Sequence, residues 1–172
     1  MILMNRHIVL SALAIILLPM AICAENGYQW GTVTDIDIDT QDGHITKQSD
    51  IRVGSTAITM SISGADTEAI ITADNSSAAQ LKDTDGGATD TLVTEYKLEF
   101  DGNGSSESGG TNTEYATYDT FLSGGGVEVK YSNNDYDVVV TIYVRVSNRS
   151  DNVADAGVYS ATQTLTVMWD GI

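Results

Sequence analysis

The chain has 172 residues, of which 24 are acidic and 8 are basic, so its formal net charge at pH 7 is −16. This acidity argues against nucleic acid and anionic membrane surfaces as partners, because both are bound through a positively charged protein surface. The length predicts one domain that is large enough to bury a core.

The first residues have the pattern of a secretory signal peptide. A short basic start precedes the apolar run Ile8–Ile22, and the small residue Ala24 follows it. The run is shorter than the ~20 apolar residues of a membrane span, so no stable membrane insertion is expected. We expect residues 1–24 to be a cleaved signal outside the fold, with a lipid anchor on Cys23 as the alternative. The protein is then exported, through the periplasm if the host is Gram-negative, and its mature chain has no cysteine for a disulfide.

The stretch VTDIDIDTQDG, from Val33 to Gly43, fits two structures. Its alternating aspartates resemble the start of a calcium loop. An EF-hand loop that began at Asp35 would need glycine at its sixth position and glutamate at its twelfth, where this chain has Thr40 and Thr46. The stretch is therefore not an EF-hand, and no cofactor is expected. A looser calcium site built from loop oxygens remains an alternative.

The same stretch also fits a long two-faced β-strand that begins near the mature N-terminus. One face of this strand would carry Tyr28, Trp30, Thr32, Thr34, Ile36 and Ile38. The other face would place Asp35, Asp37 and Asp39 in water. The strand either pairs within its own domain or inserts into the sheet of a neighbouring subunit. The expected organisation is an N-terminal arm at residues 25–40 and a β-sandwich at residues 41–172.

Alternating apolar residues predict further strands along the rest of the chain. In chain order they are Ile51–Ser63, Glu68–Thr72, Leu92–Phe100, Glu114–Phe121, Gly126–Tyr131, Tyr136–Ser147 and Val158–Trp169. A short turn capped by Asn75 is the one helical signal. Such strands, joined by loops rich in glycine and aspartate, predict an all-β antiparallel sandwich. The apolar strand Tyr136–Ser147 would be prone to aggregation at an open edge, so something must cover it.

The last third of the chain carries a family resemblance. After the strand that ends at Ser147, a polar loop leads to Ala156, Gly157 and Tyr159, and a threonine-rich strand follows. This ending resembles the spore coat protein U-like secreted subunits of chaperone–usher fimbriae, and LVTEYKLEFDG from Leu92 resembles their mid-domain strand. The resemblance implies an immunoglobulin-like sandwich that lacks one strand, with each subunit supplying its N-terminal extension to the next. It also implies a homo-oligomeric surface filament with a role in adhesion or biofilm, and a periplasmic chaperone as a partner.

Two other functions are weighed against this interpretation. A self-contained secreted sandwich could bind carbohydrate or calcium, and a set of aromatic residues could form a sugar-stacking platform. These residues are Trp30, Tyr115, Tyr118, Tyr131, Tyr143 and Trp169. A hydrolase is the third interpretation, but a serine triad needs a histidine base, and the mature chain offers only His44, beside a turn glycine. We therefore expect a structural protein and not an enzyme.

Overall fold

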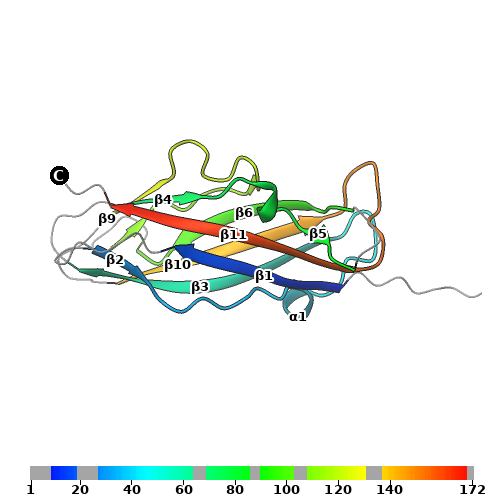
Figure 1. The fold of residues 1–172 in the computed structure, drawn as a ribbon, viewed down its shortest axis with the longest axis horizontal. Coiled ribbons are helices and arrows are strands. Elements are labelled where there is room, and N and C mark those ends of the chain that lie inside the picture. The colour runs from blue at the N-terminus through cyan, green and yellow to red at the C-terminus, as the bar shows by residue number, and fades with distance from the viewer. Residues whose placement is uncertain are drawn as a thin grey trace, which may run out of the picture.

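Two β-sheets enclose a shared apolar core (Figure 1). The computed structural model describes residues 9–18, 27–63, 69–85, 90–102, 108–130 and 137–169, of which 9–18, 27–29, 62–63 and 169 are described by their backbone. The strands are β1 (Val9–Leu18), β2 (Gly27–Trp30), β3 (Ile51–Ser63), β4 (Ala69–Ala73), β5 (Lys82–Asp83), β6 (Val93–Phe100), β7 (Gly109–Gly110), β8 (Ala116–Thr117), β9 (Val127–Lys130), β10 (Asp137–Ser147) and β11 (Val158–Trp169). Two short helices complete the list, α1 (Ile38–Asp42) and the 3-10 turn η1 (Ser77–Ala79).

The strand order divides the chain between the two sheets. One sheet runs β1-β11-β4-β9-β7, with β5 also paired to β11, and the other runs β2-β3-β10-β6-β8. Among the described residues, every pairing between named strands is antiparallel except that of β1 with β11. The all-β antiparallel sandwich predicted from the sequence is therefore confirmed.

The apolar strand β10 lies in the middle of its sheet. It pairs with β3 along eleven positions, from Asp137 with Ser61 to Ser147 with Ile51, and with β6 on its other side. Its alternate residues are buried, as the period-two pattern predicted, and they are Val138, Val140, Ile142, Val144 and Val146. The cover that this strand requires therefore comes from its own chain.

The two other clear strand patterns also place their apolar residues in the core. β6 buries Tyr96, Leu98 and Phe100 from one face. β11 buries Tyr159 near its start, and the Tyr159 hydroxyl donates to the backbone carbonyl of Asp155, four residues upstream, at 2.9 Å. A tyrosine that bonds back to the preceding loop in this way ties the loop to the start of a sandwich strand.

Two local predictions differ from the structure. Within the segment from Glu114 to Phe121, the strand covers only Ala116–Thr117, and a turn follows it. The short helical turn begins one residue later than expected, because Ser76, not Asn75, accepts the amide of Ala78 at 3.3 Å. Both differences lie in short polar segments, where side chains compete with the backbone for hydrogen bonds.

The N-terminal arm is held against the inner face of β3 at one tight contact. Gly54 is buried, and a Cβ atom at this position would lie 2.5 Å from Cγ2 of Ile36 and 3.0 Å from Cγ1 of Ile38. Both isoleucines are themselves buried. A residue without a side chain is therefore required where the arm enters the core.

We predict that Gly54→Ala destabilises the protein by about 1–3 kcal/mol, because the added methyl group overpacks the core and pushes Ile36 and Ile38 outward. Urea denaturation followed by circular dichroism measures this change. Gly124→Ala is the matched control, because a Cβ atom there would meet no atom within 4 Å. Equal stability of the two variants would contradict this account of the arm.

Candidate functional site

The edge of β11 has the composition of a strand that accepts a partner. Its twelve residues, VYSATQTLTVMW, include no charge and no proline. Proteins usually protect exposed strand edges with lysine, proline or a bulge, since an open edge pairs with other chains. Sequence analysis assigned this strand to the sandwich but did not identify its edge as a site. The absence of protecting residues is the signal that could have found it.

The strand β1 occupies this edge in the structure. It runs parallel to β11, with register pairs from Val9 with Val158 to Leu18 with Thr166 and an irregularity between Leu10 and Leu13 (Figure 1). Val9–Leu18 of the expected leader thus pairs with β11 in the full chain, and the removal of residues 1–24 stays a prediction. The edge of β11 therefore pairs with a ten-residue apolar strand that comes from the segment with the pattern of a removable leader.

The N-terminal arm is a strand over only part of its predicted length. β2 pairs Gly27–Trp30 with β3, and the amide of Gly31 still donates to the carbonyl of Thr59 at 2.8 Å. The predicted continuation of this strand to Ile38 is wrong. The chain carries no regular ladder between Trp30 and Ile36, and at Ile38 it enters the helix α1.

The helix forms because local hydrogen bonds outweigh the alternating pattern. The carboxylate of Asp37 accepts the amide of Thr40 at 3.3 Å, which caps the first turn. Gly43, at φ 86°, then ends the helix with an amide that donates to the carbonyl of Asp39. Aspartate and glycine are the residues that perform these two tasks, so the stretch carried a second structural signal that competed with the strand.

The six residues predicted to form one docking face do not share a face within the subunit. Trp30, Ile36 and Ile38 are buried in the core of their own chain. Thr32 and Thr34 are exposed, and the Thr34 hydroxyl lies 2.8 Å from that of Thr56. The backbone of Tyr28 pairs with that of Ile62 in the ladder with β3. The arm thus has a first part, up to the exposed threonines, that pairs with β3 and buries Trp30, and a second part that begins at Ile36 and buries Ile36 and Ile38.

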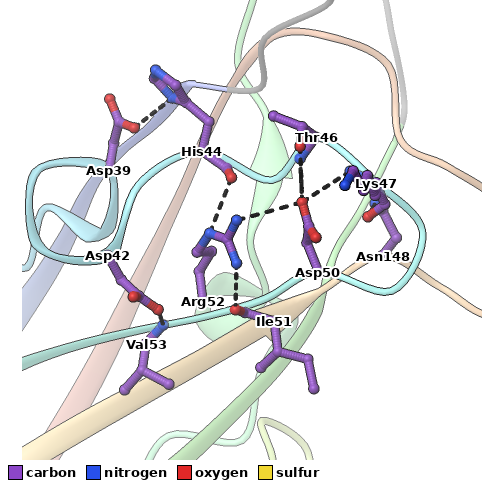
Figure 2. Close-up of polar contacts among 10 residues, drawn as sticks. All are labelled: Asp39, Asp42, His44, Thr46, Lys47, Asp50, Ile51, Arg52, Val53 and Asn148. Carbon is purple, nitrogen blue, oxygen red and sulfur yellow. Dashed lines mark hydrogen bonds and ion pairs between the residues drawn. The ribbon is translucent and has the colours of Figure 1, made fainter.

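The aspartates after the arm are used as hydrogen-bond and ion-pair partners. Figure 2 shows Asp39 directed at the imidazole of His44, and Asp42 accepting the amide of Val53 at 2.9 Å. In the part of the chain that the structure describes, no three acidic, histidine or cysteine side chains gather closely enough to hold a metal ion. The carboxylates of this stretch therefore organise a loop, and His44 is a partner within it.

The same loop is closed by Asp50. One of its oxygens accepts the amide of Thr46 at 2.9 Å, the Thr46 hydroxyl at 3.0 Å and the amide of Lys47 at 3.0 Å (Figure 2). The guanidinium of Arg52 lies 3.4 Å from this oxygen and donates to the carbonyl of His44 at 3.0 Å. The hydrogen bonds from Thr46 are the main reason that the pKa of Asp50 lies below its ordinary value of 3.8.

The aromatic residues named for a sugar platform do not gather at one place among those that the structure describes. Tyr115 and Tyr143 come together on the outer face of the second sheet, where the Lys97 ammonium lies 5.2 and 4.4 Å from their ring centroids. The Arg145 guanidinium covers Tyr115 at 4.1 Å and also forms two bonds, of 2.7 and 2.9 Å, with Glu95. These rings are stacked with cations of their own sheet.

The other four aromatic residues named for that platform lie elsewhere. Trp30 is in the core, and Tyr131 and the side chain of Trp169 lie outside the described residues. Tyr118 lines an open surface pocket of about 380 Å³ together with Asp119, Arg149 and Asp151. Arg149 already pairs with Asp151 at 3.3 Å. The pocket therefore contains one ring for stacking, that of Tyr118, and two charges that neutralise each other.

Comparison with protein-family models, with curated proteins and with solved structures found no match for this chain. Among the described residues, no helix has the length and apolar character that crossing a membrane requires. The assignment of a function therefore depends on the sequence and on the geometry of the β11 edge and the N-terminal arm.

We predict that Asp50→Asn lowers the melting temperature at pH 7, because it removes a charge that the folded loop stabilises. The folded-state pKa is depressed, so this stabilisation is present above pH 3.8 and is lost as the pH falls through the folded-state pKa. Melting curves between pH 2 and pH 7 should show the two proteins converging in acid. Asp151→Asn, at a side chain that is 71% exposed, is the control and should melt like the wild type. A constant gap at every pH would contradict the prediction.

Proposed function

We propose that this protein is a structural subunit of an extracellular fibre whose subunits join by β-strand addition. The observation that carries the proposal is the edge of β11, which pairs with a ten-residue strand from the leader-like segment. Removal of residues 1–24 on export would leave the unprotected edge of β11 open. A strand of another copy would then satisfy its backbone groups, as in other cases of strand addition.

The first part of the arm fits as the strand that one subunit donates to the next. From Glu25 to Asp35 the arm has 11 residues, which extend to about 36 Å at about 3.3 Å per residue. The 12 residues of β11 span about 40 Å on the same measure. The donated segment ends before Ile36, so Ile36 and Ile38 would stay in their own core while Trp30 would leave it with the strand.

Contacts of this kind join one surface of a subunit to a different surface of the next. Such head-to-tail contacts do not close on themselves, and they generate open filaments. The net charge of −16 keeps the exposed surfaces of such a filament soluble outside the cell. In this proposal the filament is displayed on the cell surface, serves adhesion or biofilm formation, requires no catalytic chemistry, and is assembled with a periplasmic chaperone if the host is Gram-negative.

A closed sandwich is the second candidate function, and the pairing of β1 with β11 favours it if the leader is retained. In that case β1 would complete the sheet of its own chain, and the protein would act as a secreted monomer. Mass spectrometry of the exported protein separates the two candidates, because strand addition to β11 requires the loss of residues 1–24.

We predict that the exported, processed chain forms filaments that are visible by electron microscopy, and that Thr32→Pro prevents them. Proline removes a backbone donor from the arm, and Thr32 lies outside the strands of the free subunit, so the monomer should still fold. Thr32→Val keeps the amide and is the matched control, which should polymerise normally. A processed wild type that stays monomeric at high concentration would overturn the proposal.

We also predict that a synthetic peptide of Val9–Leu18, flanked by lysines for solubility, caps the edge of β11 and arrests filament growth. The same peptide with Ile15→Pro cannot complete the ladder and should be at least about tenfold less potent, since proline breaks strand pairing. Light scattering during assembly measures both effects. Equal potency of the two peptides would show that inhibition is not due to pairing at this edge.

A further inference from the structure

Three buried side-chain atoms of the described residues lack hydrogen-bond partners, namely Nε1 of Trp30, Oδ1 of Asn75 and Oε1 of Gln163, and the first and third are chemically complementary. The indole Nε1 of Trp30 is a donor, and the amide Oε1 of Gln163 is an acceptor. Neither finds a partner in the part of the chain that the structure describes. Trp30 is 9% exposed and Gln163 is fully buried, so water does not readily serve either atom. Unsatisfied buried groups of this kind are rare in native proteins, and each calls for an explanation.

Gln163 lies at the middle of β11, on the face that is turned to the core. Its Nε2 group donates to the carbonyls of Asp74 and Thr164, each at 3.1 Å, which fixes the side chain and leaves Oε1 without a donor. The residue of β1 in register with it is Ile15, and an isoleucine side chain has no hydrogen to donate. The leader therefore places an apolar residue in register with Gln163.

Trp30 is the last residue of β2 and lies at the middle of the segment from Glu25 to Asp35. Its register partner on β3 is Met60, whose side chain has no good acceptor for the indole. The tryptophan ring is thus buried, but its N–H group has no acceptor there.

A centred alignment of the two strands brings these atoms together. The middle of β11 falls between Gln163 and Thr164, so an arm segment laid centre to centre places Trp30 opposite one of these two residues, parallel or antiparallel. Of the two, Gln163 is the one that is buried, so the register that turns Trp30 to the core places it opposite Gln163. Residues that lie opposite each other in neighbouring strands project from the same face of a sheet. The next inward residue of β11 is Ala161, whose small side chain leaves room for the indole ring.

We propose that the indole N–H of Trp30 from one subunit donates to Oε1 of Gln163 in the next, and that this bond sets the register of the donated strand. The inference rests on the strand-addition function and names its specificity-determining pair. A shift of one residue would turn the arm's apolar face away from the core, and a shift of two would leave both polar atoms buried without partners.

The test is a double-mutant cycle with a fluorescent peptide of residues 25–35 titrated into the processed full chain. Trp30→Phe in the peptide, or Gln163→Met in the chain, should each weaken binding about three- to tenfold, which is the range expected for one buried hydrogen bond. When both changes are present, the affinity should fall little further, because the same bond is lost. Gln29→Ala in the peptide, on the opposite face of the alternation, is the control and should bind like the wild type.

Each outcome separates the pair from the strand-addition function itself. If the two losses of affinity multiply in the double variant, the two residues act independently. This result would overturn the Trp30–Gln163 bond and would leave the docking of the arm intact. Failure of the wild-type peptide to bind, while the leader peptide binds, would overturn the arm as donor. If Gln163→Met does not fold, nuclear magnetic resonance of a ¹⁵N-indole-labelled peptide on the wild-type chain decides the matter. The bound indole proton should be protected from exchange, and a freely exchanging proton would overturn the proposal.

Discussion

The backbone of β11 imposes the constraint on which the rest of this structure depends. A strand in a two-layer sandwich must satisfy its N–H and C=O groups along both edges, and β11 has β4 and β5 on one side only. On the other side it offers twelve residues without charge or proline. In this structure β1 meets that requirement, and the stability of this edge depends on which segment pairs with it.

The N-terminal arm has two parts that are attached to their own domain in different ways. Ile36, Ile38 and the cap at Asp37 belong to the core and to α1, and both isoleucines pack closely against Gly54. The part before them is held by the short ladder of β2 with β3. An arm that is anchored at Ile36 and paired before it by a short strand can exchange that pairing for one in another subunit without unfolding its own domain. This is the physical basis of the proposed assembly.

The polar surface of the domain is organised largely by its own charges. Lys97, Arg145 and Glu95 neutralise one another around Tyr115, and Asp50 closes the loop with Arg52. Such groups stabilise local geometry and leave little ligand-binding capacity on the faces that they cover.

The amino-acid sequence by itself determined the fold class and the inward faces of β6, β10 and β11, because alternation of apolar residues is a local signal with a period of two. It also indicated the leader and the arm. It did not determine where the arm stops being a strand, since the cap of Asp37 and the turn at Gly43 compete with the same alternation. Only the tertiary structure decided that Val9–Leu18 lies beside β11, that Ile36 is an anchor, and that Gln163 and Trp30 keep unpaired atoms. Pairings between segments so distant in the chain leave no trace in local patterns, because their energy arises only when both strands are in place.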